Sequence, residues 1–272
     1  MQRIRALTIE TTTRCNLACV MCPHGLPDGV ATKTDTPADI IDRIIPSLVH
    51  VDEVQATGLG EPMLSPGFWR LAEAVQASEG RLRLRFHTNG IVLSQKRVDE
   101  LSRIPLASIN VSLDAATPET YRRVRGWNFE DCTAGVSRLV TMLAAQTDLG
   151  RPEDCLQISC VLMQENIAEA PKFVELAHQL GVKFVYFEHL VEPDIPKEDW
   201  IVHRDGFTFN YAEQSLLGKA ADSDPHLVRA FDRAEALGIK VKGEGLLQSA
   251  TLSHHEQRPC RYHGPAALPI AV

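Results

Sequence analysis

Three cysteines lie close together near the start of the chain, in the pattern Cys15-x-x-x-Cys19-x-x-Cys22. Thiolates at this spacing can wrap one inorganic centre, and an iron–sulfur cube is ordinarily held by four of them. Three protein ligands would leave one iron open for a bidentate small molecule. The alternative is zinc, because His24 follows the third cysteine and zinc accepts three Cys and one His. The spacing therefore predicts a metal centre, which is either an iron–sulfur cluster or zinc.

Three further polar motifs each follow a short apolar run. In Gly58-Leu59-Gly60-Glu61-Pro62, the glycines expose backbone carbonyls and the Glu61 carboxylate can accept hydrogen bonds from an ammonium group. Ser112 and Asp114 are two residues apart at a predicted strand end, so they point to the same side and suit a ribose diol. Each motif can also be a structural turn. The remaining motif is His87-Thr88-Asn89-Gly90, built on the turn dipeptide Asn-Gly.

The elements that must position these motifs alternate between strand-like and helix-like segments. About six βα units in this order predict an α/β fold whose parallel sheet closes into a partial (β/α)6 TIM-like barrel. The motifs would then share the face where such barrels keep their active sites. The predicted strands are Ala6–Glu10, Glu53–Thr57, Leu82–His87, Ser108–Leu113, Leu156–Leu162 and Lys183–Glu188, and the predicted helices are Pro37–Val49, Gly67–Ser78, Ser94–Ile104, Phe129–Gln146 and Ala168–Leu180 with Gly181 after it.

After Leu190 the alternation weakens, so we predict a core over residues 1–190 and a C-terminal segment over 191–272. The segment Glu192–Asp199 is rich in proline and charge and is predicted to be a connection. A long helix is expected over Ala212–Leu237 with a break near Asp222–Pro225, followed by a short strand over Ile239–Lys242.

The cysteine run and its surroundings, IETTTRCNLACVMCP, resemble the cluster loop of radical S-adenosylmethionine (SAM) enzymes, in the branch that often carries a C-terminal SPASM or twitch extension. The resemblance covers about residues 6–190 and implies a [4Fe-4S] cluster and SAM as cofactors. It implies that Cys15, Cys19 and Cys22 bind the cluster and that the remaining motifs bind SAM: Gly58, Gly60 and Glu61 the amino group, Asn89 the cofactor directly, Ser112 and Asp114 the ribose, Arg123 or Arg125 the carboxylate, and Met21 the adenine.

The family implies reductive cleavage of SAM to a 5′-deoxyadenosyl radical that abstracts hydrogen from a small-molecule or peptide substrate. An electron donor such as flavodoxin or ferredoxin is implied as partner. The sequence names no catalytic residue. An auxiliary iron–sulfur cluster would have Cys260 as its one candidate ligand in the extension, so the extension is either cut short or degenerate. The competing hypothesis is a zinc-stabilised binding or structural protein without catalysis.

Other residues carry weaker signals. Cys132, Cys155 and Cys160 are expected to pack in the core. Asn166 resembles a family residue that meets the adenine or ribose. Candidates for lining a substrate pocket are Tyr186, Glu188 and His189, whereas His254 and His255 are expected to be solvated.

Composition narrows the class of protein. The formal net charge is -7 and no Lys/Arg block stands out, so we expect neither nucleic acid nor membrane as partner. No apolar stretch approaches the roughly 20 residues of a membrane-spanning helix. The chain enters its first strand almost at once, so we expect no signal peptide and no N-terminal peptide-recognition domain. Clustered cysteines in an odd total of 7 favour a reducing, cytoplasmic location.

Overall fold

The structure is a computed structural model that describes residues 4–26, 32–145, 154–190 and 200–243. Its centre is a seven-stranded sheet in which every pairing is parallel. The strand order is β1 (Ile4–Ile9), β2 (Val51–Ala56), β3 (Arg83–Thr88), β4 (Leu106–Ser112), β5 (Leu156–Leu162), β6 (Phe184–His189) and β9 (Lys240–Gly243).

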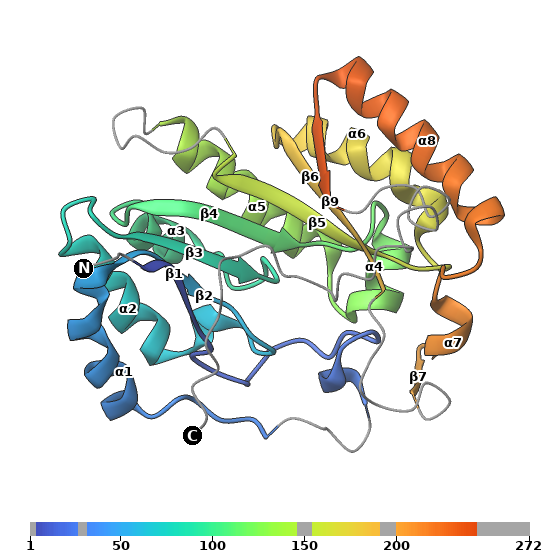
Figure 1. Ribbon diagram of the computed structural model, residues 1–272. Helices are drawn as coiled ribbons and strands as arrows, with labels where there is room; N and C mark the ends of the chain where they lie inside the picture. Colours follow the sequence, from blue (N-terminus) through green and yellow to red (C-terminus); the bar gives the residue numbers. More distant parts are fainter. Residues whose placement is uncertain (1–3, 27–31, 146–153, 191–199, 244–272) are drawn as a thin grey trace.

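The first six strands are neighbours in the order in which they occur along the chain (Figure 1). Because crossovers between parallel strands are right-handed, this order places the connecting helices on one face of the sheet. These helices are α1 (Ala38–Ile44), α2 (Pro66–Gln76), α3 (Gln95–Leu101), α4 (Pro118–Arg125), α5 (Phe129–Ala144) and α6 (Ala170–Leu180), with 3-10 turns η1 (Pro23–Gly25), η2 (Ile45–His50), η3 (Pro62–Leu64) and η4 (Ile167–Glu169). The α/β fold with a parallel barrel-type sheet is confirmed.

Alternation along the strands separates the two faces of the sheet. On β3, Leu84 and Phe86 are fully buried in the main core beneath the helices, whereas Arg85 and His87 are only partly buried. The same period of two recurs on β5, where Ile158 belongs to that core. One face therefore carries the apolar core, and the other carries polar side chains.

Local signals fix where the helices begin and end. Ser65 accepts a hydrogen bond from the Gly67 N–H and so caps the start of α2. Helix α4 ends at Gly126 and α6 at Gly181, with φ of 73° and 76°, a left-handed conformation that favours glycine. The predicted position of Gly181 is thus confirmed.

The C-terminal part of the described chain adds to the same sheet. Helix α8 (Ala220–Leu237) places Leu227, Ala230 and Ala234 in the main core, and β9 pairs with β6. The predicted break near Asp222–Pro225 is wrong, because the interruption between α7 (Tyr211–Gln214) and α8 lies at residues 215–219, where Gly218 has a φ of 78°. Pro225 is instead tolerated inside α8.

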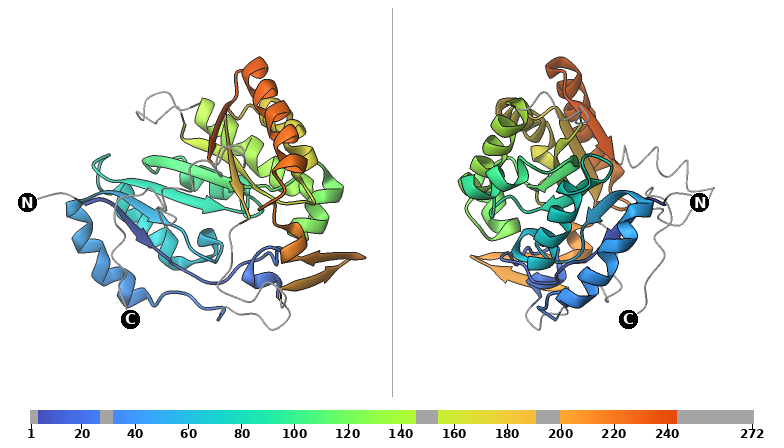
Figure 2. Two further views of the ribbon diagram at one scale, coloured as in Figure 1. Left: turned by 45° about the vertical axis from the view of Figure 1, so that its right-hand side comes forward. Right: turned by 90° about the vertical axis from the view of Figure 1, so that its left-hand side faces the viewer.

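Two elements were not among the predicted ones. Helix α4 lies between β4 and α5, and an antiparallel hairpin of β7 (Ile201–Arg204) and β8 (Phe207–Asn210) lies between β6 and α7. Figure 2 shows the hairpin outside the main sheet, beside the N-terminal loop that follows β1.

The domain boundary at residue 190 stays a prediction. The predicted connection Glu192–Asp199 lies outside the described residues, as do Cys260, His254 and His255.

Apart from the main core, the hairpin shares a smaller apolar cluster with the N-terminal loop, which we call the second core. It consists of Val20, Val124, Met163, Leu190, Trp200, Val202, Phe209 and Tyr211.

Candidate active site

The cysteine loop starts where β1 ends and turns back through a short 3-10 helix. Within it, the Cys22 N–H donates to the Cys19 carbonyl at 3.0 Å and the Gly25 N–H to the Cys22 carbonyl at 2.7 Å. Two nitrogens approach the Cys15 sulfur, namely the Leu17 N–H at 3.5 Å and the Asn89 side-chain amide at 3.8 Å. Hydrogen bonds of this kind stabilise a thiolate and tune a metal centre bound to it.

All three thiols of the motif are free, with Cys19 buried and Cys15 and Cys22 half-buried. Burial raises the pKa of Cys19 to about 12 and raises that of Cys22. Cys22 and Cys15 raise the pKa of Cys19 further, and Cys15 raises that of Cys22. The positive charge of Arg125 acts in the opposite direction on both. The three thiols therefore lie within electrostatic range of one another, and Cys19 and Cys22 also lie within range of the buried cation of Arg125.

The second motif packs directly against the cysteine loop. The Glu61 N–H donates to the Arg14 carbonyl at 2.8 Å. A Cβ on Gly60 would lie 2.7 Å from that same carbonyl oxygen and closer still to the Thr12 carbonyl, so only glycine fits. At Gly58 a Cβ would collide with the Glu10 side chain. Gly60 is thus required by the close approach of the two loops, whereas at Gly58 the exposed Glu10 side chain could move aside.

The Glu61 carboxylate is buried and points into the protein. It accepts from the Asn89 N–H at 2.7 Å, from the Thr88 hydroxyl at 2.9 Å and from the Met63 N–H at 3.3 Å. Burial raises its pKa to about 7, and the three hydrogen bonds oppose that rise. Glu61 therefore ties the second motif to the turn after β3, and its contact with a SAM amino group stays a prediction.

The turn after β3 connects to the cysteines themselves. The Asn89 side-chain amide donates to the Asn16 side-chain oxygen at 2.8 Å as well as approaching Cys15. On its other side, the buried Cys132 thiol donates to the Asn89 carbonyl at 3.4 Å. Asn89 thus lies between the cluster motif and α5, which is a position that the turn dipeptide alone did not reveal.

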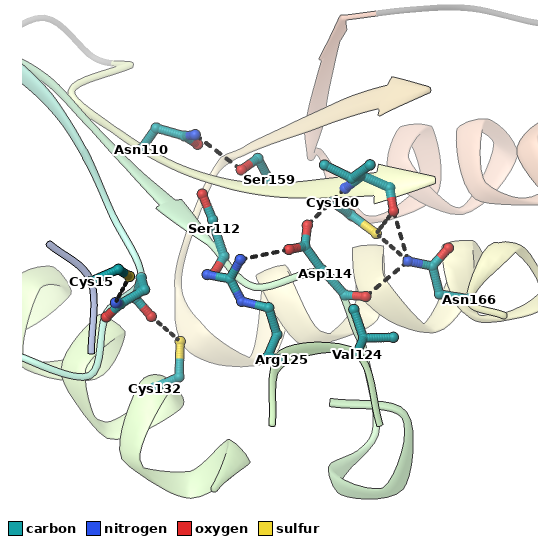
Figure 3. Close-up of polar contacts among 12 residues, drawn as sticks. Cys15, Asn110, Ser112, Asp114, Val124, Arg125, Cys132, Ser159, Cys160 and Asn166 are labelled. Carbon is teal, nitrogen blue, oxygen red and sulfur yellow. Dashed lines mark hydrogen bonds and ion pairs between the residues drawn. The ribbon is translucent and has the colours of Figure 1, made fainter. Parts of the chain in front are cut away.

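Asp114 follows β4 in a left-handed conformation, with φ of 62°. Its carboxylate is buried, pairs with Arg125 at 2.9 Å and accepts from the Val161 N–H at 2.8 Å (Figure 3). Arg125 also donates to the Ser112 carbonyl at 2.7 Å. Because the chain has left the extended conformation at Asp114, the rule that placed Ser112 and Asp114 on one side does not extend to it.

Asn166, which follows β5 in the chain, supports the turn at Asp114. Its side-chain amide donates to the carbonyls of Asp114 and Val161 at 2.9 Å and 2.8 Å, and its oxygen accepts from the Met163 N–H. In Figure 3 the side chain points toward Asp114 and Cys160. Asn166 is 1% exposed and braces this turn, so its contact with adenine or ribose stays a prediction.

The sequence offered two arginines of α4 as candidates to bind the SAM carboxylate, and in the structure they differ in burial. Arg123 pairs with Glu165 at 2.5 Å and its side chain is 40% exposed, whereas Arg125 is buried beside Asp114. Met21 is half-buried and packs against the second core. Of the site residues predicted from sequence, the structure brings together the cysteines, Asn89, the glycine motif and the Ser112–Asp114 turn, and it leaves Arg123 farther out on the surface.

The remaining predicted residues fall as follows. Cys132, Cys155 and Cys160 are buried in the main core, as predicted. On β6, Tyr186 and Glu188 are partly buried and alternate with core residues, so they lie on the polar face, while His189 ends the strand. Arg204 and Trp200 were missed, because their contacts with the cysteine loop join residues 186 and 180 positions apart.

An iron–sulfur cluster is held by Cys thiolates, and the cysteine loop supplies three of them. The charges of these thiols interact, two nitrogens approach the Cys15 sulfur, and Arg125 is a nearby cation for Cys19 and Cys22, which suits a cluster held by three Cys. The His24 ring instead lies beside the backbone of Thr13 and Leu59. Within the described ranges, no three His, Cys, Asp or Glu side chains form a group that could hold a single metal ion.

Comparison with known proteins agrees with this arrangement. The Radical SAM superfamily matches residues 9–143, from the end of β1 into α5. The mycofactocin maturase MftC of Mycobacterium tuberculosis is 32% identical over 177 residues, which are 64% of this chain and 42% of that protein. The AdoMet-dependent heme synthase of Methanosarcina barkeri is 27% identical over 89% of this chain and 69% of its own length.

Among solved structures, Streptococcus suis SuiB bound to its precursor peptide SuiA superposes with a TM-score of 0.66 at 14% identity, covering 93% of this chain and 52% of SuiB. That likeness shows a shared fold. Residues 9–143 of the chain belong to the radical SAM superfamily, and the chain spans less than half the length of the MftC relatives that it matches. Of the helices in the described ranges, none has the length and apolar character needed to cross a membrane.

Proposed function

We propose that the chain is a radical SAM enzyme with its cluster on Cys15, Cys19 and Cys22. The observation that carries this proposal is the convergence of four motifs, each of which follows one of four adjacent parallel strands. Hydrogen bonds join the first three motifs to one another. The Ser112–Asp114 turn is joined to the cysteine loop through α4, where Arg125 bonds to the turn and the Val124 carbonyl accepts from the Val20 N–H. In barrel-type folds such strand ends form the active site. A zinc-stabilised structural protein requires only the cysteine loop and leaves the other three motifs without a role.

When bound, the [4Fe-4S] cluster supplies the electron that splits SAM into methionine and a 5′-deoxyadenosyl radical, which abstracts hydrogen from the substrate. In this proposal, the chain's own residues bind and orient the cofactor. Glycines Gly58 and Gly60 let the second motif approach the cysteine loop, and Ser112 offers its hydroxyl at the end of β4. We propose that the Arg123 guanidinium pairs with the SAM carboxylate and that the Met21 side chain provides an apolar surface for the adenine.

The buried network beneath these residues keeps the site in place. Glu61, Asp114 and Asn166 join the ends of neighbouring strands through hydrogen bonds that solvent does not reach. A preorganised, dry site of this kind protects a reactive radical from quenching.

We propose a peptide or a small molecule as substrate, because the relatives include both SuiB, solved with a peptide, and a heme synthase. An electron donor of the flavodoxin or ferredoxin type is proposed as partner. We propose a reducing, cytoplasmic location, with which the lack of any disulfide among the described cysteines is consistent.

The experiment is anaerobic reconstitution with iron and sulfide, followed by dithionite, SAM and measurement of 5′-deoxyadenosine. We expect production by the wild-type protein and none by Cys19→Ala. The matched control is Cys155→Ala, which removes a buried thiol from the main core and leaves the motif intact. Equal production by Cys19→Ala and wild type would refute the cluster assignment.

The zinc alternative is separated by metal analysis of the same preparations. A zinc protein would be colourless, would retain one zinc per chain after reconstitution and would produce no 5′-deoxyadenosine. Substituting His24 would then lower its zinc content, whereas an iron–sulfur protein held by three cysteines would keep its iron in His24→Ala.

A further inference from the structure

The β7–β8 hairpin stands apart from the seven-stranded sheet and packs on the cysteine loop. Its apolar side chains Val202 and Phe209 are buried, as is Trp200 just before it, and they meet Val20 of the loop in the second core. Two-stranded hairpins alone are at best marginally stable in water. The hairpin is therefore held by the cysteine loop as much as it holds the loop.

Val20, between the second and third cysteines, is fixed at three points. Its N–H donates to the Val124 carbonyl at 3.0 Å, and its carbonyl accepts from the Trp200 ring N–H at 3.0 Å. Its side chain is 0% exposed. The backbone that sets the spacing of Cys19 and Cys22 is thus anchored by residues from α4 and from the segment before β7.

Arg204, at the end of β7, also contacts both the cysteine loop and the end of α4. Its guanidinium donates to the carbonyl of Ala18, immediately before Cys19, and to the carbonyls of Arg123 and Val124 at 3.3 Å and 3.2 Å. It lies against Gly126, where an added Cβ would be 2.6 Å from the Arg204 Cζ. One side chain therefore ties the cysteine loop to the end of α4.

We propose that the β7–β8 hairpin is a clamp on the cluster loop and that Arg204 is its positioning residue. This inference rests on the proposed function, since the clamp acts on the cluster ligands. Arg204 sets where Ala18, and with it Cys19, lies relative to α4, while Trp200 fixes the following peptide. Because coupling between two sites is reciprocal, a bound cluster also orders the hairpin.

The test compares Arg204→Ala and Trp200→Phe with the control Arg122→Ala. Trp200→Phe keeps an aromatic ring and removes the N–H that reaches Val20. Arg122 pairs with Asp205 of the same hairpin at 3.4 Å, but both side chains are more than half exposed and neither is bonded to the cysteine loop in the described contacts. Each protein is reconstituted anaerobically as the full chain, and its cluster is examined with no substrate present.

We expect Arg204→Ala to lose iron to a chelator about tenfold faster than wild type, in the range seen when supporting partners of metal ligands are removed. Its reduced cluster should show altered EPR g-values and a more negative midpoint potential, because a cation near the cluster is gone. Trp200→Phe should lose iron faster to a smaller extent, and Arg122→Ala should match wild type. In wild type, amide hydrogen exchange over residues 200–210 should slow when the cluster is bound.

Two results separate the clamp from the proposed function. If wild type binds a cluster and Arg204→Ala keeps wild-type iron retention, g-values and potential, the clamp is wrong and the proposed function stands. If wild type binds no cluster at all, the proposed function fails first. Exchange over residues 200–210 that is unchanged by the cluster would also overturn the clamp.

Discussion

The main core and the second core use similar side chains but connect different parts of the chain. The main core joins the strands to helices that lie next to them along the chain, so Phe86 of β3 packs with Phe68 of α2 at a ring-centroid distance of 5.1 Å. The second core instead joins the N-terminal loop, the end of α4 and the hairpin. The comparison teaches that the barrel can form from local units, whereas the candidate cluster site depends on a late segment of the chain.

The largest effect is expected where the two cores meet, at the buried Asp114–Arg125 pair. Arg125→Leu leaves the Asp114 carboxylate buried without its cation, which costs about 3–5 kcal/mol. Urea unfolding measures this change. The control Arg123→Leu removes an exposed pair and should cost no more than about 1 kcal/mol. Equal losses of unfolding free energy in the two variants would show that the Asp114–Arg125 pair contributes no more than an exposed pair.

The comparison itself is tested by two phenylalanines that are both 0% exposed, Phe86 in the main core and Phe209 in the second. Phe86→Ala should lower the free energy of unfolding by about 3–5 kcal/mol, as expected for a large cavity. Phe209→Ala should lower it less and should instead speed hydrogen exchange over the hairpin and the cysteine loop. A global loss as large as that of Phe86→Ala would mean that the two cores unfold as one unit.

The contact between the glycine motif and the cysteine loop predicts a smaller effect. Gly60→Ala places a methyl group against two backbone carbonyls, which must shift at a cost of about 1–3 kcal/mol. In the control Gly67→Ala, the nearest atoms belong to side chains, the Ile41 Cγ1 at 3.2 Å and the Ser65 Oγ at 3.3 Å, which need to shift less, so thermal unfolding should change less. If Gly60→Ala were as stable as the control, the close approach of the two loops would be wrong.

The smallest effect is a pH dependence at His87 on the polar face. Burial, and then the charge of Arg85, lowers the pKa of His87 from 6.5 to about 4. The unfolded chain therefore binds more protons between these values, so stability falls as the pH drops from 6.5 toward 4, by at most about 1.4 kcal/mol per pH unit. Urea unfolding of His87→Asn across this range should show a shallower slope, and an unchanged slope would contradict the burial of the ring.

Much of the barrel could be predicted from the sequence because its pattern is local. The strand Leu156–Leu162 is observed with the predicted bounds, and the other five predicted strands of the core begin and end within two residues of the observed ones. Each has a period of two beside a helix with a period of 3.6, and such signals need no knowledge of distant residues. The motifs at strand ends follow from the same reasoning.

The second core could not be predicted in this way. Its strands have only four residues each, and Trp200 meets Val20 across 180 positions of sequence.

The choice between Arg123 and Arg125 also depended on the structure, since residues two apart on a helix face different directions. Pattern alone offers both arginines, and only the position of α4 decides which one is buried.

The central claim is tested most directly by EPR spectroscopy of anaerobically reconstituted, dithionite-reduced protein before and after SAM is added. The account predicts about four irons per chain and a reduced [4Fe-4S] signal whose g-values shift when SAM binds. A protein that takes up iron but shows no change with SAM, or one that holds only zinc and gives no signal, would contradict it.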